Sequence, residues 1–359
     1  MDGATLANVR LVLALIAVPA LANADVTAGA AVGAGAQGEA TYGALDLVLT
    51  ATWPGVRVGL GARGVWDDGA FRRSDWASAA DAVTIVRDVE ASYGPVALAA
   101  GRLAPAHIGR LADGYRATLD DRWRTGARVA VTTEDVQAQA EIDDVLDPAL
   151  VGGAVRWQFA RPFAIHAAVV ADPGHATAIE AGASRRYEGE RAQLDAGGSV
   201  VAELGAGASV VAFGDGAFER EGVRWSARAD VRAGTGSVGG LFGPLYRVER
   251  LHGRMDHAGV GAGLALGASA EQGWLEVAVR ERPGLGGLVA VGGGAPMGRY
   301  VQAAAWAAAS RSDAAGAAEV RVAWAKQLFS ALQAARFYQL DAMPTSSWSL
   351  TAWFGATSP

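Results

Sequence analysis

Hydrophobic and polar positions alternate with a period of two along much of this chain. The clearest segments are residues 56–66, 127–133, 136–143 and 223–232. Successive side chains of an extended strand point to opposite faces, so each segment has one small aliphatic face and one polar face. The polar faces of these segments and of the strand after 136–143 carry Arg57, Arg63, Arg128, Gln137, Gln139, Glu141, Arg156, Arg224, Arg228, Asp230 and Arg232. The pattern predicts an all-β protein.

The connections between these segments distinguish a membrane barrel from a soluble β-sandwich, which also alternates. In the first half of the chain, short links alternate with longer ones at about 67–80, 104–123, 143–150 and 172–175. The short links are 54–55, 94–95, 134–135, 160–162 and 188–189. Outer-membrane barrels combine strands of about ten residues with short periplasmic turns and longer outer loops. The rhythm therefore favours a transmembrane β-barrel.

The energy of charged side chains in hydrocarbon decides which strand face is the inner one. An arginine that faces lipid at the midplane of such a barrel costs about 2–4 kcal/mol. Arg224, Arg228 and Arg232 share one face of a single segment. We therefore expect the polar faces to line an enclosed interior, which is either filled with water or ion-paired.

Aromatic residues lie beside the short links of the first half. They are Trp53, Tyr93, Phe159, Phe163 and Tyr187. Amphipathic rings are favoured at the boundary between membrane and water. We expect these five side chains to form one ring at the periplasmic interface.

The second half of the chain is less regular. Strands are predicted at 258–270, 274–282, 299–310, 317–327 and 347–356. Three further stretches, 236–250, 285–293 and 328–340, are compatible with strand, loop or short helix. At about 21 residues per strand and link, the prediction is an antiparallel up-and-down barrel of about 16 strands, within a range of 14–18 and with an even number.

The N-terminal residues predict export. Arg10 precedes an apolar run from Leu11 to Leu21, and Ala22-Asn23-Ala24 has the small-x-small cleavage pattern. This is the layout of a secretory signal peptide, with an apolar core too short to span a bilayer as a helix. We predict a signal peptide at 1–24, cleavage after Ala24, and a barrel domain at 25–359.

Composition narrows the function classes further. The chain has no cysteine, so disulfides, thiolate nucleophiles and cysteine-ligated metals are excluded. The net charge of −6 is not the basic footprint of a nucleic-acid-binding protein.

Two glycine patterns are candidates for a dinucleotide site, and one histidine is a candidate for a catalytic residue. Gly59-x-Gly61-x-x-Gly64 lies within a predicted strand, and neither it nor the pattern at 234–239 precedes a helix, as a dinucleotide site requires. A lipase-like barrel enzyme needs a serine activated by a histidine. His166 is the one mid-strand histidine, and the chain has no Gly-x-Ser-x-Gly. We expect no catalytic, cofactor or metal site.

The C-terminal segment completes a family resemblance. Trp348, Leu350, Ala352 and Phe354 alternate in a terminal strand that ends near an aromatic residue, although Gly355 to Pro359 follow it. With the signal peptide and the alternating strands, the chain resembles Gram-negative outer-membrane barrels of the general porin type. The resemblance implies an outer-membrane location, contact with lipid and lipopolysaccharide, and biogenesis through the barrel-assembly machinery. It leaves homo-oligomerisation open.

The long link at 104–123 is the candidate constriction loop. It carries Arg110, Asp113, Arg116, Asp120 and Asp121. A loop folded into a barrel narrows the channel, and its charges then set ion preference; the alternative is an outer-surface loop. The expected function is a porin-like channel for passive diffusion of small hydrophilic solutes or ions. The alternative is a closed barrel with an ion-paired interior that acts as a structural or interaction module.

Overall fold

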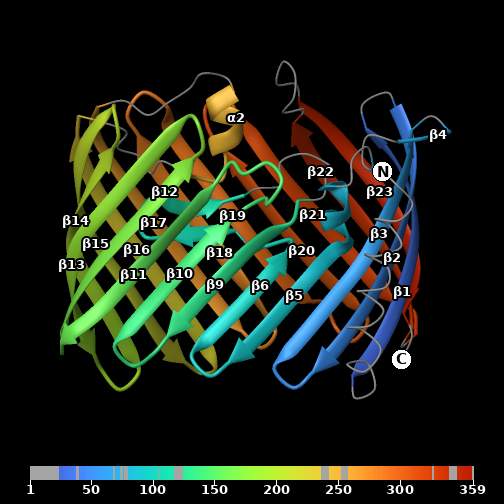
Figure 1. The fold of residues 1–359 in the computed structure, drawn as a ribbon, viewed down its shortest axis with the longest axis horizontal. Coiled ribbons are helices and arrows are strands. Elements are labelled where there is room, and N and C mark those ends of the chain that lie inside the picture. The colour runs from blue at the N-terminus through green and yellow to red at the C-terminus, as the bar shows by residue number, and fades with distance from the viewer. Residues whose placement is uncertain are drawn as a thin grey trace, which may run out of the picture.

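A single antiparallel sheet curls through the whole chain and closes on itself (Figure 1). The computed structural model describes residues 24–37, 40–67, 69–72, 76, 80–103, 105–116, 124–235, 242–251, 258–325, 327–338 and 346–357. The all-β antiparallel prediction is confirmed.

The strands of the first half are β1 (Asp25–Gln37), β2 (Ala40–Trp53), β3 (Val56–Asp67), β4 (Ala70–Phe71), β5 (Val86–Tyr93), β6 (Val96–Gly101), β7 (Ala106–Ile108), β8 (Ala112–Tyr115), β9 (Gly126–Thr132), β10 (Val136–Ile142), β11 (Val151–Ala160) and β12 (Phe163–Asp172). Those of the second half are β13 (Ala176–Glu188), β14 (Ala192–Glu203), β15 (Gly207–Arg220), β16 (Val223–Gly234), β17 (Gly259–Ala270), β18 (Gly273–Arg282), β19 (Gly286–Pro296), β20 (Val301–Ala309), β21 (Ala314–Ala323), β22 (Leu328–Tyr338) and β23 (Ser346–Thr357). Two short helices, η2 (Ala80–Ile85) and α2 (Tyr246–Leu251), lie in connections.

Closure of the barrel occurs between the first and last strands. β1 pairs with β23 from Gly29↔Thr357 to Gln37↔Ser349, and every other wall strand pairs with the next wall strand along the chain. Of the described strands, twenty form this circuit; β4 extends only the end of β3, and β7 pairs with β8 alone. A closed circuit leaves no unpaired strand edge, which is the condition for a sheet to cross hydrocarbon.

The predicted number of about 16 strands, with a range of 14–18, is wrong, although the even parity is right. The open stretches 285–293 and 328–340 are the strands β19 and β22, and α2 lies in the open stretch that begins at 236. Links on the outer-loop side are also shorter than expected. Only three residues join β12 to β13, and three join β18 to β19. Strand and link together therefore take fewer residues than the average that was assumed.

Apolar side chains cover the outside of the barrel, as the alternation predicted. In β17, Leu264 and Leu266 are about half exposed on the outer face, while Ala265 between them lines the interior. Leu264 lies opposite Val279 of β18, whose side chain is equally exposed. The outer surface is thus a continuous aliphatic band with the inner polar face turned away from it.

Aromatic side chains gather at the end of the barrel that carries the short turns. Of the five predicted residues, Tyr93, Phe159, Phe163 and Tyr187 are exposed there. Phe218 and Trp225, on either side of the β15–β16 turn, extend the set and stack with their ring centroids 6.2 Å apart. A closed barrel with an aliphatic exterior and an aromatic ring at one rim is an outer-membrane β-barrel. Among the described residues, no helix is long and apolar enough to cross a membrane.

Arg185 is an outward-facing arginine at this aromatic rim. Its guanidinium carbon lies 5.5 Å from the Phe163 ring centroid and 4.9 Å from that of Tyr187. At the membrane boundary an arginine keeps its charge in the polar headgroup layer while its stem lies along apolar surface. The rule that arginines face inward therefore holds for the hydrocarbon region and not for its boundary.

Leu264→Arg tests the assignment of the outer face. Leu264 is in the middle of β17, so the substituted barrel should lose about 2–4 kcal/mol of unfolding free energy, measured by denaturant unfolding in lipid vesicles. The matched control is Ala265→Arg on the inner face, where repulsion from Arg228 across the strand pair should cost less than about 1 kcal/mol. Equal losses for the two variants would contradict the assignment.

Candidate transport lumen

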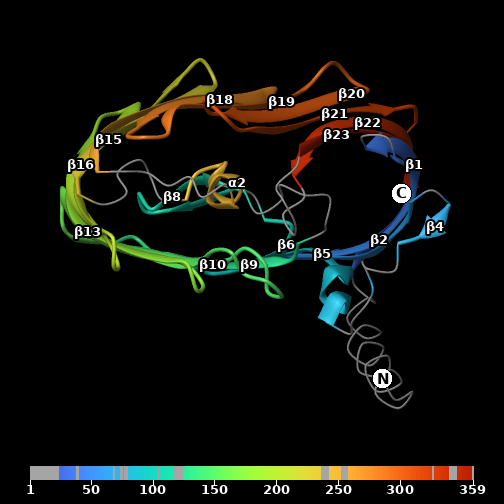
Figure 2. The ribbon, with the colours of Figure 1, turned by 90° about the horizontal axis from the view of Figure 1, so that it is seen from above.

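A hairpin from the predicted constriction loop lies inside the barrel (Figure 2). It consists of β7 and β8, joined by a turn at Gly109 and Arg110. Ile108, Leu111 and Ala112 are completely buried although they belong to a connection between wall strands. The loop therefore folds inward, and the alternative of an outer-surface loop is wrong for its described part.

The inner face of the neighbouring wall is apolar where it meets this hairpin. Ala168, Val170, Ala178, Val201 and Val211 point inward from β12 to β15 and form one buried cluster with Ile108, Leu111 and Tyr115 of the hairpin segment. Burial of one aliphatic side chain of this size is worth about 1.5–3 kcal/mol. These contacts hold the hairpin against the wall independently of its charges.

The tip of the hairpin approaches the wall through Gly109. Its φ of +55° is a left-handed conformation that favours glycine. A Cβ at this position would overlap the Glu180 carboxylate and come within 2.8 Å of the Ala168 Cβ. The next backbone N–H, that of Arg110, donates to Glu180 Oε2 at 2.7 Å. A side chain at Gly109 would therefore push the tip off the wall.

A second inward segment, residues 242–251, joins the hairpin. The Phe242 N–H donates to the Leu111 carbonyl at 3.0 Å, and the Asp113 N–H donates to the Phe242 carbonyl at 3.0 Å. Helix α2 follows, and Val248 with the adjacent Leu245 packs on Leu288 of β19. Hairpin and helix thus form one body, which we call the plug (residues 105–116 and 242–251).

Hydrogen bonds and ion pairs tie α2 to opposite walls of the barrel. Arg282 of β18 makes two hydrogen bonds to the Glu249 carboxylate, at 2.7 and 2.8 Å, and both side chains are buried. On the other side, Tyr246 donates to Asp172 of β12 at 3.0 Å and Arg250 pairs with the same carboxylate. The plug therefore bridges the lumen from β12 to β18 and divides it.

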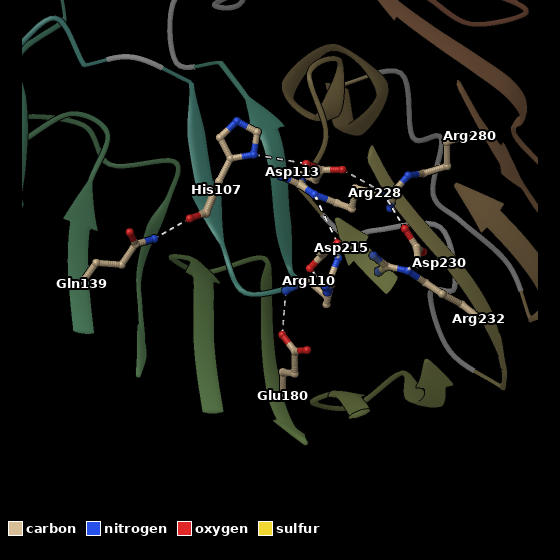
Figure 3. A network of polar contacts seen from close by, with 10 residues as sticks. All are labelled: His107, Arg110, Asp113, Gln139, Glu180, Asp215, Arg228, Asp230, Arg232 and Arg280. Atoms are coloured by element: carbon tan, nitrogen blue, oxygen red, sulfur yellow. Dashed lines mark hydrogen bonds and ion pairs between the residues drawn. The ribbon is translucent and has the colours of Figure 1, made fainter. Parts of the chain in front are cut away.

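Asp113 of the hairpin is the centre of a charged network (Figure 3). It accepts hydrogen bonds from Arg228 and, at 2.8 Å, from Arg280, and it lies 3.2 Å from His107 Nδ1. Arg280 also contacts Asp230 at 3.3 Å. Arginines of β16 and β18 therefore anchor the hairpin to a second region of wall.

The ionisation of Asp113 follows from this setting. Burial alone would raise its pKa, but the hydrogen bond with His107 and the positive charges of Arg228 and Arg280 hold the pKa well below its usual value. A carboxylate with a lowered pKa contributes stability above its unfolded-state pKa and loses it only as the pH falls through the lowered value. The anchor therefore persists well into the acid range.

The structure pairs most of the predicted inward residues with partners. Arg128 donates to Glu141 at 2.6 Å, Arg156 to Asp195 at 2.7 Å, and Arg232 to Asp230 at 2.7 Å. In the hairpin, Arg110 pairs with Asp215 and its guanidinium lies 4.0 Å from the Phe213 ring centroid. Gln139 donates to the His107 carbonyl.

Other predicted residues lie elsewhere or make fewer contacts. Arg57 and Arg224 are near the short-turn ends of β3 and β16, where Arg57 pairs with Asp88 at 3.0 Å. Gln137 is exposed on the inner face of β10. Asp120 and Asp121 are outside the described residues.

His166 lies on the inner face of β12, 3.4 Å from Glu180, with its ring edge-on to Phe213. The imidazole thus belongs to the wall beneath the hairpin tip, and the sequence expectation of a lumen-facing polar residue agrees with this position. The first glycine pattern lies in strand β3. The second begins at Gly234, the last residue of β16, and its Gly236 and Gly239 are outside the described residues.

Beside the plug lies a cavity of about 760 Å³. Its walls come from β2 and β3, from β16 to β23, and from the plug itself. Charged residues dominate its polar lining, and arginines outnumber carboxylates among them: Arg63, Arg72, Arg102, Arg116, Arg124, Arg128, Arg228, Arg280, Arg282 and Arg336 against Asp67, Asp113, Asp230, Glu276 and Glu319.

Two of these arginines, Arg102 and Arg116, lie on either side of the hairpin. Arg116 was predicted as a residue of the constriction loop, and Arg102 was not. Burial and the charge of Arg63 lower the pKa of Arg102, and Glu319 opposes the effect. Burial and the charge of Arg102 lower the pKa of Arg116 to about 10, and Glu276 opposes the effect. Both guanidinium groups remain charged at neutral pH, in a region with more positive than negative charge.

Sequence reasoning missed Arg102, Arg280 and Arg282 as inward residues, and it missed the dock of the plug. The signal for the dock is present in β12, where Ala164, Ala168 and Val170 replace polar residues on the inner face. A strand that is apolar on both faces must be covered on both. Lipid covers one face of β12, and the plug covers the other.

Comparison with known proteins finds only distant structural similarity, to outer-membrane channels. No family model and no curated protein matches the sequence. Among similar solved structures, Pseudomonas aeruginosa OccK5 (OpdH) has 11% identity and a TM-score of 0.38 over 94% of this chain and 99% of that chain. A BenF-like porin from Pseudomonas fluorescens Pf-5 has 9% identity and a TM-score of 0.38, over 94% and 100%. A Rhodopseudomonas blastica porin triple mutant has 12% identity and a TM-score of 0.32, over 93% and 100%.

At such low similarity these structures add nothing to the geometry of the chain itself. Closure between β1 and β23, the aliphatic exterior, the polar interior and an inward-folded loop are all observed in the described residues. Together they define the protein as an outer-membrane β-barrel of porin-like architecture.

Proposed function

We propose that the barrel is a channel for passive diffusion of small hydrophilic solutes or ions, with the plug as its constriction. The observation that carries this proposal is the cavity of about 760 Å³ between the plug and the walls formed by β2, β3 and β16–β23. Its charged lining favours water and polar solutes over lipid. A barrel that served only as a scaffold would have no need to keep such a space beside a tightly packed plug.

The pore-lining role extends to the inward charged residues predicted from the sequence. Arg63, Arg128, Arg228 and Asp230 line the cavity, and Asp113 and Arg116 reach it from the plug. Rings of charge at a narrow point set the preference of a pore for ions. We therefore assign the selectivity of the channel to the face between the plug and β16–β18.

The other half of the interior supports the alternative function. Between the plug and β12–β15, apolar side chains pack against the plug, and Arg156 of β11 pairs with Asp195 of β14. If the barrel is closed throughout, it is a structural or interaction module. Electrical recordings separate the two functions, because only an open path carries ions.

Single-channel recording is the direct test of the proposal. Purified barrel in planar bilayers should produce discrete conductance steps, because water in the cavity provides a path for ions beside the plug. Folding is verified in the same preparation by heat-modifiable gel mobility. Silent bilayers from preparations that pass this check would instead support the closed module.

Leu111→Asp tests the constriction. A carboxylate buried in the apolar dock without a partner costs several kcal/mol, so the hairpin should leave the wall and the height and noise of the conductance steps should change. The matched control is Leu146→Asp, since Leu146 is exposed in the link after β10. Unchanged steps for both variants would show that the hairpin does not limit the path.

A further inference from the structure

Three guanidinium groups at the cavity have no carboxylate in direct contact among the residues that the structure describes. Arg63 projects from β3, while Arg102 and Arg116 flank the hairpin. Within the described part of the chain, none of the three makes an ion pair, whereas Arg228, Arg280 and Arg282 each do. The Nε of Arg63 is buried and has no hydrogen-bond partner among the described atoms.

Aromatic rings hold two of these groups by their faces. The Arg116 guanidinium carbon lies 4.0 Å from the Trp306 ring centroid, and that of Arg63 lies 5.3 Å from the Trp353 ring centroid. Stacking uses the face of the planar guanidinium and leaves the N–H donors along its edge available. The two side chains are therefore oriented without consuming the donors that recognise an anion.

Among the described residues, the carboxylates that act on this cluster either pair with another residue or act through their charge alone. Asp46 pairs with Arg87 at 2.9 Å, and Glu319 accepts a hydrogen bond from Gln333. Glu276 acts on Arg116 only through its charge. Three positively charged side chains therefore face the same cavity. Besides burial, the charge of Arg63 lowers the pKa of Arg102, and the charge of Arg102 lowers the pKa of Arg116.

We propose that Arg63, Arg102 and Arg116 form a binding site for a small oxyanion, a carboxylate or a phosphate, within the lumen. The planar forks of the guanidinium groups match the paired oxygens of such anions, whereas a spherical chloride ion uses one contact at a time. The inference deepens the channel function and rests on it, because it names the class of solute that the constriction favours.

Titration calorimetry on the detergent-solubilised barrel tests the site without requiring a conducting path. Sodium acetate and inorganic phosphate are added separately in chloride buffer, so that the two arms distinguish a carboxylate from a phosphate ligand. We expect saturable heat from at least one of them. In the double variant R102Q/R116Q, binding should weaken by roughly tenfold or more, because two of the three charged donor groups are removed.

The control is Arg185→Gln, which removes the same charge on the outer face of β13 at the aromatic rim, away from the cavity. It should bind as the unsubstituted barrel does. The proposal is overturned if neither anion gives saturable heat in chloride buffer, or if the double variant binds equally well. Discrete conductance together with absent binding would reject the site and keep the channel, whereas binding in a silent barrel would reject the channel.

Discussion

The hydrogen bonds between β1 and β23 are the constraint on which the rest of this structure depends. In hydrocarbon, a backbone N–H or C=O without a partner costs several kcal/mol, and no water is present to replace it. Because the sheet closes from Gly29↔Thr357 to Gln37↔Ser349, every wall strand has two neighbours. Closure then fixes which side chains meet lipid and which meet each other, and so it creates the interior in which the charged residues lie.

That interior contains two different environments on either side of the plug. Toward β12–β15 the plug packs as a protein core does, with Ile108 and Leu111 completely buried. Toward β17–β22 it borders a charged cavity. Apolar contacts hold the plug on one side, and Arg116 of the plug faces the cavity on the other. The same segment can therefore be rigidly placed and still present polar groups to a solute.

The period-two pattern was sufficient to predict the barrel and the inward direction of its arginines. Segments such as 223–232 specify their faces because a slip of one residue would place Arg228 in lipid. The strand number was not predictable in the same way, because β19 is rich in glycine and has no polar side chain, and the polar residues of β22, Ser330, Gln333 and Arg336, are spaced by three instead of two. Their place in the sheet is decided by closure, which is a property of the whole chain.

The plug was predictable only as a long loop with charges. Arg110, Asp113 and Arg116 were identified as candidates, but their partners Asp215, Arg228 and Arg280 are far away in sequence. Local sequence gives no register between a loop and a distant wall. In the sequence, the apolar inner face of β12 is the sign that something covers this wall. It is not marked by the apolar–polar alternation from which the strands were predicted.

The apolar dock also determines the order in which the molecule can assemble. The hairpin precedes β12–β15 in the chain, and α2 precedes β18 and β19, which it also contacts, so neither half of the plug has its complete dock when it is synthesised. Before the plug covers them, Val170, Val201 and Val211 expose an apolar surface to the interior of the forming barrel. Wall formation must therefore come first, and ordering of the central segments is the closing step of maturation.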